Sequence, residues 1–255
     1  FPTRRSSDLL SSILWYIAIE TKNPIALPGF FFMAAFGVPL AVLVFFLECN
    51  TGGYVSGWKA MGLFLVGGVL SILFTQLFNN TELAESLYGS MNAAGAGPIE
   101  EPAKAVVLLW FAGQAKRYPF ILDGLLLGAA VGAGFAAFET AGYIFLSLEE
   151  GGVDDMRIVA VLRGVMAPFA HIAWTAAIGA AMWMSRGLHG SLRDALCSWR
   201  TVGALLLSII LHALWNAGMA GTRLSQIAWV PILFYLKRGI AQCVESRTAK
   251  GGNEA

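Results

Sequence analysis

Long apolar stretches alternate with short polar stretches along most of the chain. A helix needs about 20 largely apolar residues to cross the hydrocarbon core of a bilayer. Seven to eight stretches form complete or partial candidates, at residues 10–19, 25–47, 60–78, 99–115, 121–147, 158–184, 202–219 and 227–236. The last is short enough to lie in the membrane interface. The pattern predicts an all-α, polytopic transmembrane helix bundle, with a single membrane-embedded domain over residues 10–239 and a polar cytoplasmic tail over residues 240–255.

The composition agrees with a membrane protein. Hydrophobic residues make up 57% of the chain and charged residues only 13%, whereas soluble domains carry about 25% charged residues. A protein so poor in charge is expected to expose much of its surface to lipid. The net charge of +1 gives no support to a nucleic-acid partner, which would require clustered basic residues. The three cysteines have no metal-ligand spacing.

The first nine residues, FPTRRSSDL, back-translate into a sequence that resembles a common sequencing adaptor. We interpret residues 1–9 as a translated artefact and leave them out of the predicted fold. The apolar stretch at residues 10–19 is then expected to be the remnant of a longer helix.

Basic residues gather in alternate loops. Lys116 and Arg117 follow the fourth apolar stretch, and three arginines lie within residues 185–201. The loop at residues 148–157 instead carries four acids and one arginine. Because Lys and Arg concentrate in cytoplasmic loops, the first two loops and the C-terminus are predicted to face the cytoplasm. The protein is expected to be a multi-pass protein of a prokaryotic plasma membrane, with residues 148–157 outside.

Ionisable side chains recur inside four of the apolar stretches. Such groups cost several kcal/mol in a bilayer, and they are functional candidates by default. At a helical rise of about 1.5 Å per residue, the predicted topology places most of them in the outer half of the membrane. The set consists of Glu100, Glu101, Lys104, Asp123, Glu139, Arg163, His171, His212 and the neutral Asn216.

Acids and imidazoles at one depth can support hydrolysis. A carboxylate can activate water as a general base, and imidazole or amide groups can stabilise an oxyanion. Glu139, His171 and His212 can alternatively hold a metal ion, commonly zinc. Each of these residues, taken alone, can have a purely structural role. Glu139 can be the ion-pair partner of Arg163, and a lone histidine can simply link two helices.

Four short motifs resemble those of the PrsW family of intramembrane proteases. EEPAK at residues 100–104 resembles EExxK, and FAAFE at 135–139 resembles FxxxE. HIAWT at 171–175 and HALWN at 212–216 resemble the two histidine motifs that follow. The wider group includes CAAX-processing and bacteriocin-immunity membrane proteases, which usually show EExxxR and FxxxH instead.

The resemblance implies a membrane-embedded endopeptidase, usually grouped with metallopeptidases, that cuts a single-pass membrane protein near its extracytoplasmic side. The first cut of an anti-sigma factor in a stress response is one such reaction. We expect Glu100, with or without Glu101, to activate water. Glu139 and His171 would position this water or bind a metal, and His212 and Asn216 would stabilise the oxyanion.

Two other functions remain open. A transporter or channel could use the same acids and histidines as an ion relay, and a non-catalytic scaffold could retain them without turnover. Transporters of this kind often consist of two matching halves, and the sequence shows no internal repeat.

Overall fold

The fold is a bundle of helices, seen in a computed structural model that describes residues 9–10, 12–17, 24–112, 117–188, 190–218 and 229–251. No strand occurs in these ranges, so the all-α prediction is confirmed. The elements are η1 (Pro24–Ala26), α2 (Leu27–Cys49), α3 (Gly57–Asn79), α4 (Glu82–Met91), η2 (Asn92–Gly95), α5 (Ala96–Ala112), α6 (Ile121–Arg186), α7 (Leu192–Leu196), α8 (Trp199–Asn216) and α10 (Trp229–Gly251).

Helices α2, α3 and α6 are each long and apolar enough to cross a membrane, within the described part of the chain. The predicted stretches at 25–47, 60–78, 99–115 and 202–219 correspond to α2, α3, α5 and α8. The proposed artefact at residues 1–9 lies almost wholly outside the described residues, whereas residues 10 and 12–17 of the stretch at 10–19 are described and helical.

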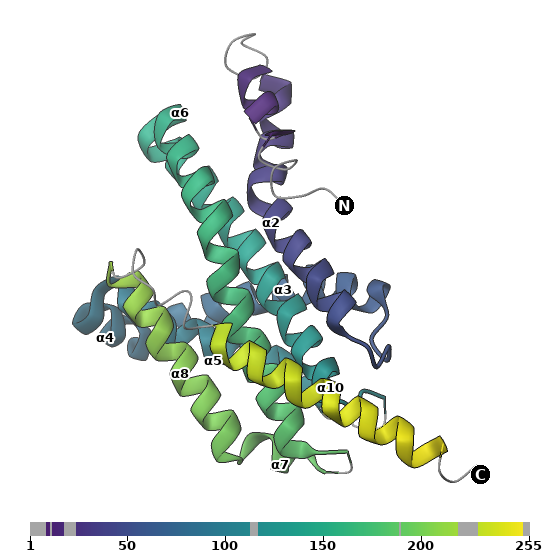
Figure 1. Cartoon of the computed structure of the whole chain (residues 1–255). Coiled ribbons are helices and arrows are strands. Elements are labelled where there is room, and N and C mark those ends of the chain that lie inside the picture. Colours follow the sequence, from purple (N-terminus) through teal and green to yellow (C-terminus); the bar gives the residue numbers. More distant parts are fainter. Residues whose placement is uncertain are drawn as a thin grey trace.

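Helix α6 is a hairpin of two helical arms, although the sequence predicted a loop of about ten residues between them. Both arms continue to Gly152, which alone departs from helical geometry, with φ 80° and ψ −163°. Glycine adopts this conformation readily because it has no Cβ. Figure 1 shows the two arms running side by side, with α2 beside them.

The arms of α6 touch through a row of glycines spaced four residues apart. A Cβ at Gly124 would lie 2.7 Å from the carbonyl oxygen of Gly179, and one at Gly132 would lie 2.6 Å from that of His171. Gly128 meets the backbone of Thr175 in the same way. Small residues allow such close approach of membrane helices, so this row fixes His171 against the first arm.

Replacing Gly128 with valine is expected to lower the free energy of unfolding by about 3 kcal/mol, the upper end for an overpacked site. The new side chain would meet the opposite backbone, which has no flexible group to move aside. Thermal unfolding in detergent measures the effect. Gly142→Val on the same arm is the control, because nothing lies within 4 Å of its Cβ position. Equal stability of the two variants would contradict this description of the arm contact.

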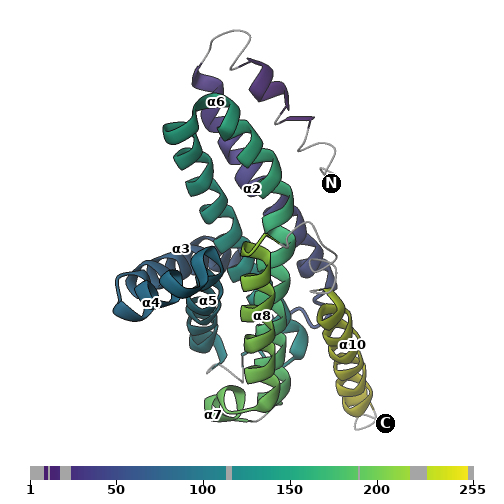
Figure 2. The same cartoon turned by 90° about the vertical axis from the view of Figure 1, so that its left-hand side faces the viewer.

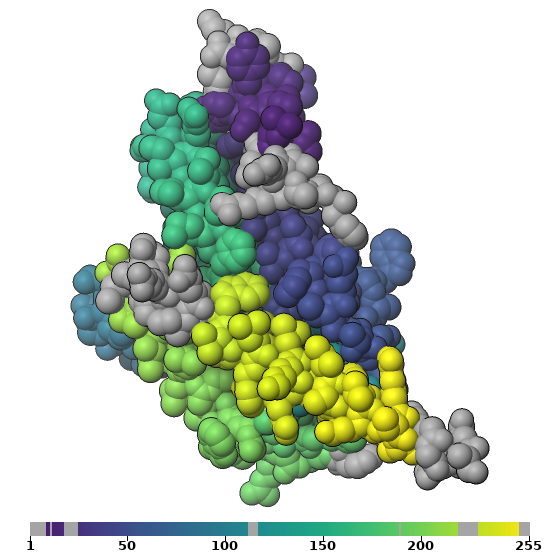
Figure 3. All heavy atoms as spheres, viewed as in Figure 1, coloured from purple at the N-terminus to yellow at the C-terminus, as the bar shows by residue number. Residues whose placement is uncertain are grey.

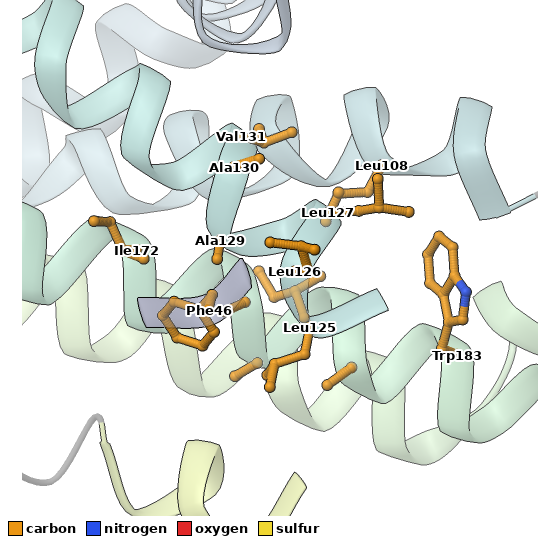
Figure 4. Close-up of a cluster of buried hydrophobic side chains, with 14 of the residues drawn as sticks. Phe46, Leu108, Leu125, Leu126, Leu127, Ala129, Ala130, Val131, Ile172 and Trp183 are labelled. Carbon is orange, nitrogen blue, oxygen red and sulfur yellow. The ribbon is translucent and has the colours of Figure 1, made fainter. Parts of the chain in front are cut away.

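The apolar core surrounds the first arm of α6. Figure 4 shows Leu125–Leu127 among Phe46 of α2, Leu108 of α5 and Trp183 of the second arm. The indole nitrogen of Trp183 donates a hydrogen bond of 2.8 Å to the carbonyl oxygen of Tyr118. This bond links the end of the second arm to the residues just before the first arm.

Helix α10 is longer than the stretch at 227–236 from which it was predicted. Residues 240–250 contain no proline or glycine, and the helix continues through them to Gly251. Its Cys243 is buried, and Figure 3 shows α10 lying across one face of the molecule. Helices α4 and α7 were not predicted, because they are only ten and five residues long and lie in polar loops.

Candidate active site

Four helical segments converge on a buried polar cluster. Helix α5 supplies Glu100, Glu101 and Lys104, while the first and second arms of α6 supply Glu139 and His171. Helix α8 adds His212, so five of the six predicted site residues lie within one network of contacts. The sixth, Asn216, lies one turn further along α8.

Close packing of α5 on α8 makes this convergence possible. A Cβ at Gly97 would lie 2.7 Å from the carbonyl oxygen of Ile209, so only glycine fits at this crossing. On α5, Glu100 and Lys104 are four residues apart and share a face. The crossing therefore brings the α5 acids within reach of His212.

Glu101 and Lys104 form a fully buried ion pair. The ammonium Nζ lies 2.6 Å from Glu101 Oε1, and both side chains have 0% exposure. The same carboxylate oxygen lies 2.8 Å from His212 Nδ1. A carboxylate only accepts hydrogen bonds, so Nδ1 carries the proton in neutral His212. Its Nε2 then presents a lone pair and lies 3.8 Å from Glu100 Oε2.

His171 carries its proton on the other ring nitrogen, Nε2. Lys104 Nζ lies 3.0 Å from its Nδ1, and a lysine ammonium only donates. The proton of neutral His171 is therefore on Nε2, which lies 3.1 Å from Glu139 Oε2. Arg163 Nη2 pairs with the same glutamate oxygen at 2.6 Å. Glu139 thus forms the ion pair with Arg163 that the sequence had suggested as its structural role, and His171 contacts the same carboxylate oxygen.

Glu100 differs from the other two acids because no cation lies close to it, whereas Lys104 Nζ lies 2.6 Å from Glu101 and Arg163 Nη2 lies 2.6 Å from Glu139. Its buried Oε2, like that of Glu101, accepts no hydrogen bond from any residue that the structure describes. Lys104 Nζ is 3.9 Å away.

Glu100 lines a cavity of about 390 Å³, together with Glu139, Tyr88 and Asn216. We call this space the site cavity. A carboxylate oxygen that accepts no hydrogen bond at the edge of this cavity is available to a water molecule or a cation.

Asn216 lies at the rim of the site cavity. Its Nδ2 donates a hydrogen bond of 3.1 Å to the carbonyl oxygen of Ala93 in η2. An amide nitrogen carries two hydrogens, so one N–H remains for a ligand in the cavity.

Glu100, His171 and His212 offer ligand atoms within 4.8 Å of one another. Nitrogen and carboxylate donors suit zinc, and the unpartnered Glu100 Oε2 fits a cation. His212 also has a carboxylate on its second nitrogen, as metal-binding histidines usually do. Donors around a tetrahedral zinc lie about 3.4 Å apart, so modest movements would close the site. The predicted set contained Glu139 in place of Glu100, and a zinc ligand role for Glu139 stays a prediction.

Three residues contribute to the cluster beyond the six to which the sequence assigned catalytic or metal roles. Lys104, a candidate without an assigned role, is fully buried between two acids and His171. Phe135 lies under it, with the ring centroid 4.1 Å from Nζ. Trp174 stacks on His212 at 4.8 Å and meets the edge of His171 at 5.3 Å. The sequence offered one sign of a role for Trp174, its position inside the HIAWT motif. Its contact with His212 could not be predicted, because the two residues lie on different helices.

Comparisons with known proteins agree with the motifs. Protease PrsW of Clostridioides difficile (strain 630) is 27% identical over 162 residues, which cover 60% of this chain and 63% of the relative. The chain therefore matches less than two thirds of that relative's length. No solved structure matches. The profile described as PrsW family intramembrane metalloprotease matches residues 54–236, which include all four motifs. The resemblance is confirmed, and the chain belongs to the PrsW family of intramembrane metalloproteases.

Proposed function

We propose that the protein is a membrane-embedded endopeptidase that cleaves membrane-anchored proteins. The observation that carries the proposal is Glu100, whose buried Oε2 has no hydrogen-bond partner among the described residues and which lines the site cavity beside two imidazoles, with no cation as close as those of Glu101 and Glu139. Glu101 is neutralised by Lys104 and Glu139 by Arg163. Glu100 is thus the acid best placed to exchange a proton with water.

In the proposed reaction, Glu100 Oε2 takes a proton from a water molecule, whose oxygen forms a bond to the scissile carbonyl carbon. The resulting oxyanion accepts hydrogen bonds from His171 Nε2–H and from the second N–H of Asn216. Glu100 then returns the proton to the leaving amine as the carbon–nitrogen bond breaks. The sequence predicted oxyanion stabilisation by His212. We propose His171 for this role instead, because Nδ1 of His212 donates to Glu101 and leaves its Nε2 without a proton.

Zinc is the metal that this donor set suits best. A metal-dependent reaction is the alternative to the scheme above, and in it Glu100, His171 and His212 would be zinc ligands instead of base and oxyanion donor. Bound there, the zinc would polarise a water molecule and the substrate carbonyl. This alternative predicts about one zinc per chain in protein purified without chelator, and His212→Ala should lose it. Asn216→Ala, outside the ligand set, should keep it.

Elemental analysis measures the zinc content per chain independently of activity. A metal-free protein with full, chelator-resistant activity would assign Glu100 to a metal-free glutamate protease.

The proposed substrate is a single-pass membrane protein, cut near its extracytoplasmic side, with an anti-sigma factor as one case. The charge pattern of the loops supports a multi-pass arrangement in a prokaryotic plasma membrane with the site cavity toward the outside. Reconstitution of the protein into liposomes with single-pass substrates tests the activity, with product masses locating the cut. Ion flux across the liposomes without cleavage would assign the ion relay, and neither activity would favour a scaffold.

The predicted topology can be tested with a native cysteine. Cys197 is exposed after α7, in a loop predicted to be cytoplasmic. A membrane-impermeant maleimide is expected to leave Cys197 unlabelled in intact cells and to label it in opened membranes. In a Cys197→Ser background, Asp154→Cys beside the Gly152 turn should react in intact cells. The reverse labelling pattern would place the site in the cytoplasmic half of the membrane.

A further inference from the structure

A second cavity lies between α8, α10 and the second arm of α6. It has a volume of about 240 Å³ and a mainly apolar lining. We call it the α8–α10 cleft. Leu207 of α8 and Phe234 of α10 line it and are 42% and 52% exposed, so the cleft opens on the outer surface of the bundle. Figure 2 shows α8 and α10 as separate helices beside α6.

The cleft matches one leaflet of a bilayer in length. Along α8 it extends from Arg200 to Leu211, and along α6 it extends from Ala173 to Met184. Each of these stretches covers 11 helical steps, or about 17 Å. One leaflet contributes half of the hydrocarbon thickness of about 30 Å. The acyl chain of a single lipid can therefore lie along the whole cleft.

A polar pocket adjoins the cleft at its Arg200 end. Its volume is about 370 Å³, and Met184 and Arg200 line both spaces. The other lining side chains come from the start of α6 and from α10. They are Ile121, Arg238, Ala241, Gln242 and Glu245. We call this space the basic pocket, because two of its three charged residues are arginines.

Two arginines against one acid, Glu245, give the basic pocket a net positive charge. Neither Arg200 nor Arg238 forms an ion pair with an acid that the structure describes. Oε1 of Gln242 accepts a hydrogen bond of 3.0 Å from the backbone N–H of Ile121, which leaves the amide hydrogens of Gln242 for a ligand. Guanidinium groups bind phosphate through paired hydrogen bonds. The pocket is therefore suited to an anionic group.

The basic pocket lies at the side of the bundle that is predicted to be cytoplasmic. Ile121 begins the first arm of α6, Met184 lies near the end of the second arm, and Trp199 begins α8. Trp199 is 74% exposed, and the guanidinium of Arg200 lies 5.0 Å from its ring centroid. Tryptophan is enriched at membrane interfaces, and basic pockets between helices on this side bind anionic lipid headgroups. The pocket thus lies at the level where headgroups are expected.

We propose that the α8–α10 cleft and the basic pocket form one binding site for an anionic phospholipid. An acyl chain lies in the cleft, and the headgroup phosphate lies between Arg200 and Arg238. Free phosphate would leave the cleft unfilled, and an uncharged apolar ligand would leave both arginines without an anion. Trp174 lines the cleft and stacks on His212 at 4.8 Å. The bound chain therefore contacts a residue that packs on the candidate active site, although binding itself requires no proteolysis.

Lipid binding to the full chain in detergent tests the headgroup end of the site. Native mass spectrometry should show one phosphatidylglycerol per chain, bound more tightly than phosphatidylcholine, whose headgroup is zwitterionic. The double variant Arg200→Gln, Arg238→Gln should bind phosphatidylglycerol at least about tenfold more weakly. Both arginines are exposed, so this variant should unfold at the wild-type temperature in lipid-free detergent.

Lys237→Gln is the matched control, because Lys237 is an exposed cation beside Arg238 that lines neither cavity. It should bind phosphatidylglycerol with the wild-type affinity. Equal affinity of the wild-type protein for the two lipids would overturn the anionic site. An unchanged affinity in the double variant, or an equal loss in Lys237→Gln, would overturn it as well.

Gly203→Phe tests the cleft. Gly203 lines it, and nothing lies within 4 Å of its Cβ position, so phenylalanine takes the space of the acyl chain without straining the fold. Affinity for phosphatidylglycerol should fall at least about tenfold, as expected when two or more buried methylene groups are displaced. Gly62→Phe on α3 is the control, because its Cβ position is equally open and lies outside the cleft. Unchanged binding in Gly203→Phe, or an equal loss in both variants, would contradict the placement of the acyl chain.

Discussion

Glu100→Gln is expected to reduce cleavage by about 10²–10⁴-fold, the usual contribution of a positioned general base. Glutamine keeps the size of the side chain but has no carboxylate to accept a proton. Because Glu100 Oε2 has no hydrogen-bond partner in the described part of the chain, the substitution breaks no bond there. The variant should therefore unfold at the wild-type temperature while kcat collapses.

Glu85→Gln on α4 is the matched control, because Glu85 is an exposed acid outside the cluster. It should retain wild-type turnover. Glu101→Gln is expected to lose both activity and stability, since its carboxylate holds Lys104 and His212. Full turnover in Glu100→Gln would remove Glu100 from the chemistry, and a matching loss of stability would show a structural role.

Lys104→Met should destabilise the protein by about 3–5 kcal/mol, the usual effect of removing one partner from a buried ion pair. Lys104 contacts Glu101 and His171 and is wholly inaccessible. Methionine has a similar length, so the loss comes from charge and hydrogen bonding more than from volume. Thermal or denaturant unfolding in detergent provides the measurement.

The double variant Glu101→Gln, Lys104→Met removes both charges of the pair. It should be more stable than Lys104→Met alone, because no uncompensated carboxylate remains. Lys237→Met on an exposed position of α10 is the control for loss of a positive charge. A double variant no more stable than the single one would show that Lys104 acts mainly through His171.

Sequence patterns were sufficient for the helices but not for the partners inside the cluster. That Glu100 and Lys104 share a face follows from their helical spacing alone, since it depends only on residues of α5. It did not reveal that Lys104 contacts His171, because 67 residues separate them and the contact depends on how α5 crosses α6. The pairing of Glu139 with Arg163 was considered as an alternative, since each could be recognised as an unpaired intramembrane charge.

Two helix ends show where local pattern was insufficient. The polar residues around Gly152 were predicted to form a loop, but acids and small residues continue both arms to a single glycine. Likewise, the stretch after Leu236 was predicted to be a tail because it is polar, although helix formation does not require apolar residues. In both cases polar residues were taken as the end of a helix, although the helix continues through them.

The row of glycines in α6 is expected to prevent the two arms from sliding past each other. Backbones that touch at Gly124, Gly128 and Gly132 have no side-chain layer that could rearrange to let the arms slide. The hairpin is therefore expected to move as one rigid body and to keep Glu139 and His171 in register throughout a catalytic cycle. Helix α3 also meets the first arm backbone to backbone, at Gly68 and Gly134, so any opening that admits a polypeptide is expected to come from α5 or α8. In the proposed enzyme, the α6 hairpin would be the rigid element, and α5 and α8 would be the mobile ones.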